Sequence, residues 1–211
     1  MAEDFDDDAY GFGDFEFERR FLVKELPVAF RDSPSLIIQN YYLAKDGYAI
    51  RVRVLASGVQ ATVAEMDDHY GLLLAEKEKF DFAAITVKGP AAGGTRYEAE
   101  RSIDPGVGAE LVARGEAVIV KTRYSVWLGE DGWVIDEFGG ANTGLIIAEC
   151  ERSGPVTDLQ IPKFCVTEIT DDHRFANDSL ALNPYQNWAA AYQRELARVG
   201  PIFRQDFGTN R

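Results

Sequence analysis

The chain has 211 residues, of which 27% are charged and 12% are aromatic, the composition of a folded globular domain rather than of a disordered or fibrous protein. Its 35 acidic residues outnumber the 22 Lys and Arg residues, and the formal net charge of -13 opposes general binding to nucleic acid or to an anionic membrane. No apolar stretch approaches the roughly 18 residues of a membrane span, and the first residues are acidic where a signal peptide is basic and then apolar. We therefore expect a cytoplasmic protein with no membrane partner.

The N-terminal segment 1–14 carries six carboxylates, three aromatic residues and no basic residue. Like charges at this density repel one another, so we expect a disordered acidic tail. The alternative is that Phe5, Tyr10 and Phe12 dock the segment on a partner or on a basic groove of the same chain.

Residues 15–151 contain eight short segments in which apolar and polar side chains alternate, separated by turn-forming residues such as Asp46-Gly47 and Gly93-Gly94. This spacing of strands and turns is typical of an antiparallel sandwich or barrel. The predicted strands span residues 15–23, 35–44, 48–55, 82–89, 95–103, 117–128, 132–138 and 145–151.

Three other segments have apolar residues at helical spacing and predict helices over residues 62–79, 108–114 and about 184–199. The first lies in an insertion of about residues 56–81, and the residues at helical spacing on its predicted buried stripe are Val63, Met66, Tyr70, Leu73, Leu74 and Lys77. We expect this insertion to cover the barrel wall; closing a barrel mouth or forming a homodimer are the alternatives. The domain is then predicted over residues 15–200, with a C-terminal tail at 201–211.

Residues two apart on a strand share a face, and this rule collects seven carboxylates and seven cationic groups on one face of the predicted strands. The opposite face is apolar. The carboxylates are Glu16, Glu18, Glu98, Glu100, Asp136, Glu149 and Glu151, and the cationic groups are Arg20, Arg51, Arg53, Lys88, Arg96, Lys121 and Arg123.

The simplest interpretation of the charged face is that it faces water. However, helices with apolar stripes can cover only the apolar face of a sheet, so a closed barrel with helices outside places the charges inside. Charges in a barrel interior must pair, bind ions or hold a ligand. Guanidinium groups match phosphate oxygens, and clustered carboxylates bind hard divalent cations. Since eight strands enclose room for one small ligand, the pattern predicts a metal-bound polyphosphate.

The run Glu16-Phe17-Glu18-Arg19-Arg20 resembles the E-x-E-x-K signature of the CYTH superfamily, the triphosphate tunnel metalloenzymes. Further segments resemble the later blocks of that family, in the same order, and are closest in kind to its bacterial inorganic triphosphatases. These segments are IIQNYYL, RVRV, TVKGP, TRYEAE, VKTRY, IDEF, GLIIAECE and VTEITDDHRFANDSLA. The resemblance covers about residues 15–184 apart from the insertion. It implies a mostly β protein of the α+β class, an eight-stranded antiparallel β-barrel tunnel with helices packed outside.

The resemblance also implies roles for the charged residues. Metal binding falls to Glu16, Glu18, Asp136, Glu149 and Glu151, and phosphate binding to Arg51, Arg53, Lys88, Lys121 and Arg123, with Arg96 matching less closely. Glu98 and Glu100 are implied to hold a second metal or the attacking water.

One residue of the signature departs from the family pattern, because Arg20 stands in place of its lysine. The positive charge is kept, but a wide planar guanidinium replaces a compact ammonium group. We therefore expect this position to keep phosphate binding better than the precise positioning that catalysis requires. Arg20 is grouped with Glu98 and Glu100 as a catalytic candidate. Glu168 and Asn177 match family positions too, and both tunnel contacts and turn or capping roles stay open for them.

The activity that the resemblance implies is hydrolysis of a linear triphosphate, dependent on Mg²⁺ or Mn²⁺. The first choice of substrate is inorganic tripolyphosphate, which would give pyrophosphate and phosphate. Phosphoryl transfer to water requires positioning and charge neutralisation, which this set of residues supplies. One alternative is an adenylyl cyclase of the class IV type in the same tunnel. Another is a non-catalytic sensor of polyphosphate or of a nucleotide, which the departure at Arg20, the insertion and the acidic tail motivate.

Overall fold

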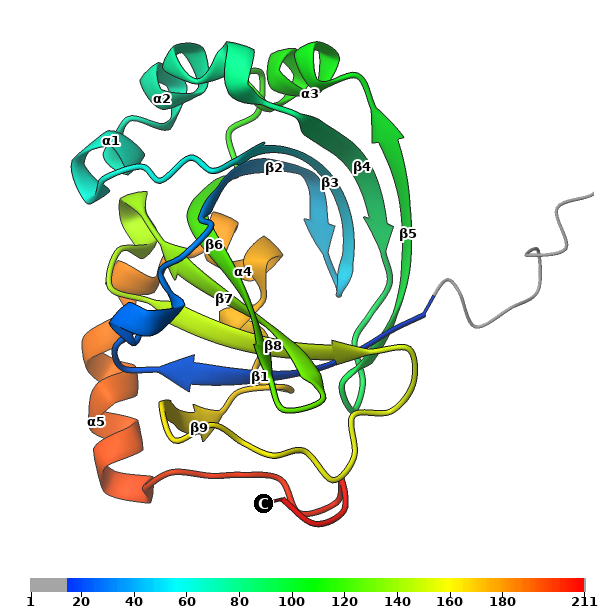
Figure 1. Ribbon diagram of the computed structural model, residues 1–211, viewed down its shortest axis with the longest axis vertical. Coiled ribbons are helices and arrows are strands. Elements are labelled where there is room, and N and C mark those ends of the chain that lie inside the picture. The colour runs from blue at the N-terminus through cyan, green and yellow to red at the C-terminus, as the bar shows by residue number, and fades with distance from the viewer. Residues whose placement is uncertain (1–14, 211) are drawn as a thin grey trace, which may run out of the picture.

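The computed structural model describes residues 15–210, so the predicted acidic tail at 1–14 lies outside the described residues. Its centre is an antiparallel β-barrel (Figure 1). The strands run in the order β5-β4-β3-β2-β6-β7-β8-β1, and pairing of β1 with β5 closes the ring. The eight strands are β1 (Phe15–Val23), β2 (Ser35–Lys45), β3 (Tyr48–Ser57), β4 (Phe82–Lys88), β5 (Thr95–Ile103), β6 (Val118–Leu128), β7 (Asp131–Phe138) and β8 (Ile146–Arg152). The predicted eight-stranded barrel is confirmed.

Strand β1 changes partner along its length. Residues Phe15–Phe17 pair with β5, whereas Phe21–Val23 pair with a ninth strand, β9 (Cys165–Glu168), which the sequence did not predict. Between these two regions the turn before β5 lies against β1, where the Glu18 N–H donates to the Gly94 carbonyl at 2.8 Å. Gly94 has a φ of 72°, and a Cβ there would lie 2.5 Å from the Glu18 carbonyl oxygen, so only glycine allows this contact.

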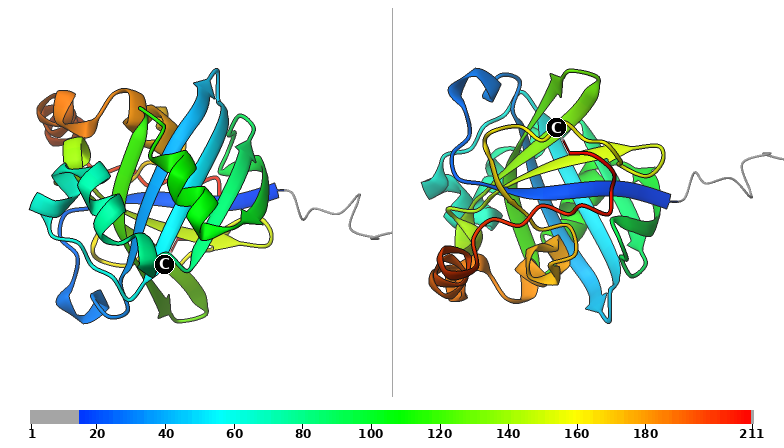
Figure 2. Two further views of the ribbon diagram at one scale, coloured as in Figure 1. Left: turned by 90° about the horizontal axis from the view of Figure 1, so that it is seen from above. Right: turned by 90° about the horizontal axis from the view of Figure 1, so that it is seen from below.

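The apolar outer face of the barrel is covered by helices on two sides. Helices α1 (Val63–Asp67), α2 (His69–Ala75) and α3 (Pro105–Val112) pack on β2, β3 and β4, and Figure 2 shows α3 lying across these strands. Helices α4 (Asn177–Leu182) and α5 (Ala189–Val199) cover a second apolar cluster that includes Ile119, Phe138 and Ile147. The apolar side chains therefore pack against helices outside the barrel, and the opposite face of each strand lines the barrel interior.

The prediction of a single amphipathic helix over residues 62–79 is wrong. The Asp68 side chain accepts a hydrogen bond from the Gly71 N–H at 2.9 Å, and this cap ends α1 and starts α2 in a new direction. The change of direction alters which side chains are buried. Met66, Leu72 and Leu73 are buried, whereas Val63, Tyr70 and Leu74 are exposed.

The other two predicted helices have different boundaries in the structure. Helix α3 begins before the predicted start at Gly108, because the Asp104 side chain accepts a hydrogen bond from the Val107 N–H at 3.0 Å and caps the helix. The helix predicted from about residue 184 begins only at Ala189, after a 3₁₀ turn at Tyr185–Asn187. Helix α4 was not predicted.

The C-terminal residues run back along the outside of β1 and β9, as Figure 2 shows in red beneath the blue strand β1. The Glu168 N–H donates to the Ile202 carbonyl at 2.8 Å, and the Asp158 N–H donates to the Phe207 carbonyl at 2.8 Å. The last residues of the described chain thus add a layer behind β1. Within residues 15–210 no helix has the length and apolarity that crossing a membrane requires.

Candidate active site

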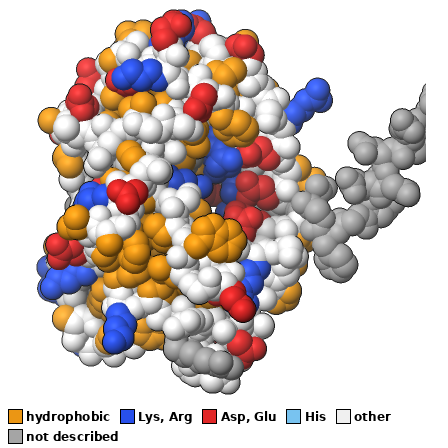
Figure 3. Space-filling model, in the orientation of Figure 1, with side chains coloured by type: hydrophobic (Ala, Val, Ile, Leu, Met, Phe, Trp, Pro, Cys, Tyr) orange, Lys and Arg blue, Asp and Glu red, His pale blue; other side chains and the backbone are white. Residues whose placement is uncertain are grey.

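The barrel encloses a cavity of about 1010 Å³. Figure 3 shows acidic and basic side chains gathered around a hollow that opens on the face seen in Figure 1. All the charged residues predicted to face inward line the cavity, with the exception of Asp136. They are Glu16, Glu18, Arg20, Arg51, Arg53, Lys88, Arg96, Glu98, Glu100, Lys121, Arg123, Glu149 and Glu151. Strand parity therefore placed the charged side chains correctly.

Asp136 is fully buried in the wall, between two of the cations that line the cavity. Its carboxylate accepts from Lys121 Nζ at 2.5 Å and from Arg123 Nε and Nη2, each at 2.8 Å. Burial alone would raise the pKa of Asp136, but Arg123 and Lys121 hold it below its usual value. Both oxygens of Asp136 are thus engaged by cations, so the metal-ligand role predicted for Asp136 has no support in this geometry and stays a prediction.

A second ion-paired group lies on β3, β4 and β5. Arg51 Nη2 lies 3.1 Å from Glu100 Oε2 and 2.9 Å from Thr86 Oγ1, and Arg53 Nη2 lies 2.8 Å from Glu100 Oε1. Burial would raise the pKa of Glu100, but Arg53 and the Thr86 hydroxyl lower it. Glu100 is therefore ionised and holds the two guanidinium groups side by side on the cavity wall.

Glu16 and Glu98 meet at Lys88, where β1 closes on β5. Lys88 Nζ lies 3.4 Å from Glu16 Oε2 and forms an ion pair with Glu98 as well. Burial raises the pKa of Glu16 to about 9, against the lowering effect of Lys88. Burial acts the same way on Glu98, yet the hydrogen bond from Glu16 and the charge of Lys88 lower its pKa to about 2. At neutral pH the two carboxyl groups therefore share one proton.

Glu18, Glu149 and Glu151 bring negative charge together on β1 and β8. Glu18 pairs directly with Glu151 across the two strands, and Glu149 pairs with Arg20. Burial, and next the charge of Glu18, raise the pKa of both Glu149 and Glu151. Glu149 lies 3.5 Å from Arg123, and Glu151 forms no ion pair with any residue between 15 and 210. This part of the cavity is therefore short of positive charge.

The carboxylates of β1 and β8 form a candidate metal region. Within the part of the chain that the structure describes, no three His, Cys, Asp or Glu side chains converge as a ready-made metal cluster. The donor chemistry nevertheless fits a hard divalent cation, which prefers carboxylate oxygens and would relieve the repulsion among Glu18, Glu149 and Glu151.

The guanidinium groups leave hydrogen-bond donors unused. The Nε–H groups of Arg20, Arg51, Arg53 and Arg96 are buried and make no hydrogen bond with the described residues, and all four side chains line the cavity. A buried donor without an acceptor is unfavourable and rare in folded proteins. A phosphate chain carries oxygens that satisfy such donors, so these four groups fit an anionic ligand.

Arg20 is anchored in a way that the sequence did not predict. Its Nη2 donates to the Thr170 carbonyl at 3.0 Å and its Nη1 to the Phe175 carbonyl at 3.3 Å, while Nε lies 3.4 Å from Glu18 Oε1. The segment after β9 therefore fixes the Arg20 side chain from behind, with Nε toward the carboxylate of Glu18.

Glu168 and Asn177, whose roles stayed open in the sequence, lie in different environments. Glu168 is outside the barrel, where its carboxylate accepts from Arg19 Nε at 2.9 Å and Nη2 at 2.7 Å, and both side chains are buried. Asn177 lines the cavity, together with Asp178 of α4. Glu168 is thus part of a buried ion pair behind β1 rather than of the cavity.

Some cavity residues were not predicted as candidates. Tyr41, Trp127, Arg152 and Asp178 all line the cavity. Trp127 lies on the same strand face as Lys121 and Arg123, so the rule of alternation that identified those two residues would have identified it too. Asp178 lies on the short helix α4, for which the sequence carries no periodic signal.

The chain is similar to known proteins in sequence and in structure. No family model matches the chain. A protein of Acetivibrio thermocellus named inorganic triphosphatase is 36% identical over 110 residues, which span 51% of this chain and 70% of that protein. The solved structure of the hypothetical protein NE1496 aligns with a TM-score of 0.50 at 23% identity, over 80% of this chain and 98% of that chain. A structure described as the inorganic triphosphatase NE1496 aligns with a TM-score of 0.49 at 23% identity, over 80% and 95% of the two chains.

Proposed function

Since the chain belongs to the CYTH superfamily of triphosphate tunnel metalloenzymes, we propose that it is a triphosphatase that hydrolyses inorganic tripolyphosphate to pyrophosphate and phosphate. The observation that carries the proposal is the set of buried guanidinium donors without hydrogen bonds, which share one enclosed cavity with unpaired carboxylate charge. A linear triphosphate and a divalent cation complement these two features together.

The phosphate chain is assigned to the basic side chains of the wall. Arg51, Arg53 and Lys88 come from β3 and β4, Arg96 from β5, and Lys121 and Arg123 from β6, so the cations surround the cavity from several strands. Asp136 and Glu100 hold four of these cations in fixed orientations. Cations that are already oriented stabilise the charge of a reacting phosphoryl group without further rearrangement.

The metal is assigned to the carboxylates of β1 and β8, namely Glu16, Glu18, Glu149 and Glu151. A bound Mg²⁺ or Mn²⁺ would neutralise phosphate charge and polarise the phosphorus–oxygen bonds. The proposal covers both metals. The proposed location is the cytoplasm, where the free, buried thiols of Cys150 and Cys165 would stay reduced.

The remaining candidates, Arg20, Glu98 and Glu100, are assigned to the terminal phosphate and the water that attacks it. Glu98 is ionised, so its carboxylate would accept a hydrogen bond from a water molecule and orient it. Both oxygens of Glu100 already accept from Arg51, Arg53 and Thr86, so Glu100 would act by holding the two guanidinium groups toward the terminal phosphate. Arg20 is anchored by two backbone carbonyls, with its Nε 3.4 Å from the Glu18 carboxylate, so its guanidinium is fixed beside the proposed metal ligands. In-line attack of the water on the terminal phosphorus then releases phosphate and leaves pyrophosphate.

A panel of tripolyphosphate, ATP and thiamine triphosphate, each with Mg²⁺ or Mn²⁺, tests the proposal through the release of phosphate. We expect metal-dependent release from tripolyphosphate. Formation of cyclic AMP from ATP without release of phosphate would instead identify an adenylyl cyclase. Tight binding of tripolyphosphate with no release over hours, with either metal, would identify a non-catalytic sensor.

A further inference from the structure

Strand β1 lacks a strand partner on one edge between its pairings with β5 and β9. Phe15–Phe17 pair with β5 and Phe21–Val23 pair with β9, so the backbone groups of Arg20 on this edge need other partners. The Ile169 N–H donates to the Arg20 carbonyl at 2.8 Å, and the Arg20 N–H donates to the Thr170 hydroxyl at 3.2 Å. A side-chain hydroxyl therefore takes the place of a strand carbonyl beside the charged interior.

Thr170 holds Arg20 by two contacts. The Thr170 hydroxyl accepts from the Arg20 N–H, and the Thr170 carbonyl accepts from Arg20 Nη2 at 3.0 Å. Both residues are buried, so water does not compete strongly for these groups. One residue thus fixes both the backbone from which Arg20 extends and the guanidinium that lines the cavity.

Glu168 sets the orientation of the Thr170 hydroxyl. The hydroxyl donates its one proton to Glu168 Oε1 at 2.7 Å, which leaves an oxygen lone pair for the Arg20 N–H. Glu168 is fixed in turn by its ion pair with Arg19 and by the Arg204 N–H, which donates to Glu168 Oε2 at 2.8 Å. The ion pair outside the barrel is therefore connected through Thr170 to Arg20 inside it.

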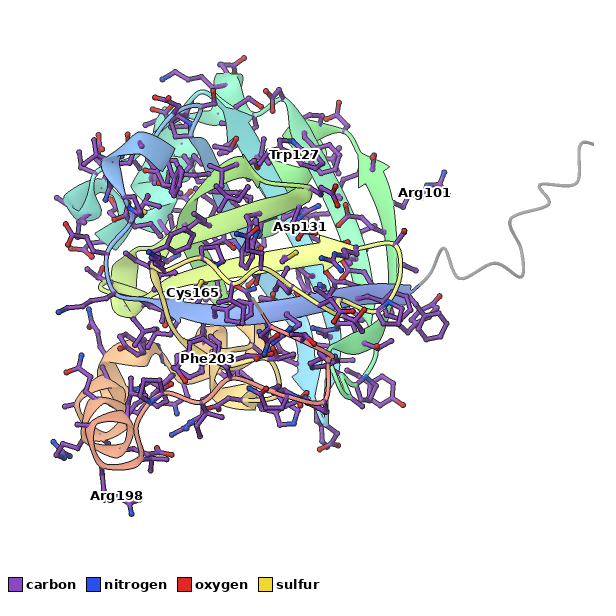
Figure 4. All side chains as sticks on the ribbon, turned by 60° about the horizontal axis from the view of Figure 1, so that its bottom comes forward. Arg101, Trp127, Asp131, Cys165, Arg198 and Phe203 are labelled. Atoms are coloured by element: carbon purple, nitrogen blue, oxygen red, sulfur yellow. The ribbon has the colours of Figure 1, made fainter. Side chains whose placement is uncertain are left out.

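The C-terminal segment covers this connection. Figure 4 labels Phe203 of that segment and Cys165, the first residue of β9, beside β1, and the Phe203 ring stacks on the Phe21 ring with centroids 6.4 Å apart. The side chains of Arg19 and Glu168 are 0% and 1% exposed. Because solvent is kept from this ion pair, the orientation of the Thr170 hydroxyl is fixed as well.

We propose that Thr170 is a positioning residue for the reaction, which holds Arg20 in the orientation that the terminal phosphate of the substrate requires. The inference rests on the proposed triphosphatase function and extends it to a residue that does not line the cavity. Hydrogen bonds that orient a residue of the site from behind typically contribute about 10- to 100-fold to affinity or activity. Glu18, a proposed metal ligand, shares the strand face of Arg20, so a shift of β1 at this point displaces both.

The test compares two buried threonines of the full-length protein that each make two side-chain hydrogen bonds. Thr170→Val removes the contact with Arg20. Thr167→Val is the matched control, because the Thr167 hydroxyl donates to the Ile202 carbonyl and accepts from the Ile202 N–H, away from the cavity. We expect Thr170→Val to lower kcat/KM for tripolyphosphate by roughly tenfold, and Thr170→Ser, which keeps the hydroxyl, to restore it to within about twofold of the wild type. Thr167→Val should lower the melting temperature by a similar amount and keep kcat/KM within about twofold.

Equal kinetic losses in Thr170→Val and Thr167→Val, or no rescue by Thr170→Ser, would show that Thr170 serves only the stability of the fold. If Thr170→Val does not fold, Thr170→Ala and Thr167→Ala make the same comparison. Equilibrium binding of tripolyphosphate with Mg²⁺ separates these results from failure of the proposed function. If the wild type binds tripolyphosphate without hydrolysing it, binding weakened severalfold by Thr170→Val and unchanged by Thr167→Val still supports the positioning role, and equal binding by the two variants contradicts it. A wild type that neither binds nor hydrolyses tripolyphosphate would overturn both proposals.

Discussion

Glu18 and Glu151 lie directly opposite each other on β1 and β8, and both line the interior of the barrel. Two carboxylates in this position repel each other, so we expect a neutral side chain at position 151 to stabilise the metal-free protein. Charge that lowers the stability of the ligand-free protein is a feature of binding sites, where a ligand removes the repulsion. The Glu18–Glu151 pair is therefore what we expect of a site whose repulsion a bound cation relieves.

Replacing one member of this pair should separate stability from activity. We expect Glu151→Gln to raise the melting temperature of the metal-free protein by about 1–4 °C, since like-charged cross-strand pairs cost up to about 1 kcal/mol. The same variant should lose most of the metal-dependent release of phosphate. Thermal melting in EDTA and a phosphate assay measure the two effects. Glu130→Gln, on the exposed turn of the β6–β7 hairpin, is the matched control and should change neither. A lower melting temperature together with full activity would contradict this interpretation.

Asp136 should be essential for stability, because it is the counter-ion of two cations. In Asp136→Asn, Lys121 and Arg123 keep their charges but lose the carboxylate that they share in the wall, and breaking a buried pair of this kind costs about 3–5 kcal/mol. Urea unfolding measures the loss. Asp131→Asn breaks a bidentate pair with the more exposed Arg152 and should cost about 1 kcal/mol or less. Similar losses in the two variants would show that the wall pair is not specially buried.

The dependence of stability on pH should reveal the protonated state of Glu16. The pKa of Glu16 is raised from 4.5 to about 9, so the folded protein keeps a proton that the unfolded chain releases between these values. The free energy of unfolding therefore falls as the pH rises from 5 to 8, and Glu149 and Glu151, whose pKa values are also raised, act in the same direction. Glu16→Gln mimics the protonated form, so its melting temperature in EDTA should exceed that of the wild type by a margin that grows with pH. A constant or shrinking margin between pH 5 and 8 would be inconsistent with a raised pKa.

Strand parity is a local rule, and it predicted the orientation of the charged residues well. Lys121 and Arg123 face inward because alternation along β6 leaves them no other face once Val120 and Tyr124 are packed outside. The inward orientation of the charged side chains then followed from the apolar stripes of the helices, because these helices can only lie outside a closed barrel. The eight strands and the composition of the cavity wall were accordingly within reach of the sequence.

Features that depend on tertiary contacts or on competing local signals could not be predicted from the sequence. The cap at Asp68 overrides a helical pattern that is continuous in the sequence. The anchoring of Arg20 uses the backbone carbonyls of Thr170 and Phe175, which lie more than a hundred residues away and carry no side-chain signal. Glu168 matched a family position, but only the packing of β9 against β1 shows that it pairs with Arg19 behind the barrel wall.

Mg²⁺-dependent release of phosphate from tripolyphosphate, measured for the wild-type protein and for the double variant Glu16→Gln/Glu18→Gln, tests whether the interior of the barrel is catalytic. If the carboxylates of β1 hold the metal inside the barrel, the wild type releases phosphate and the double variant, folded by circular dichroism, releases none above background. Equal rates for the two folded proteins would show that the charged interior of the barrel is not the catalytic site.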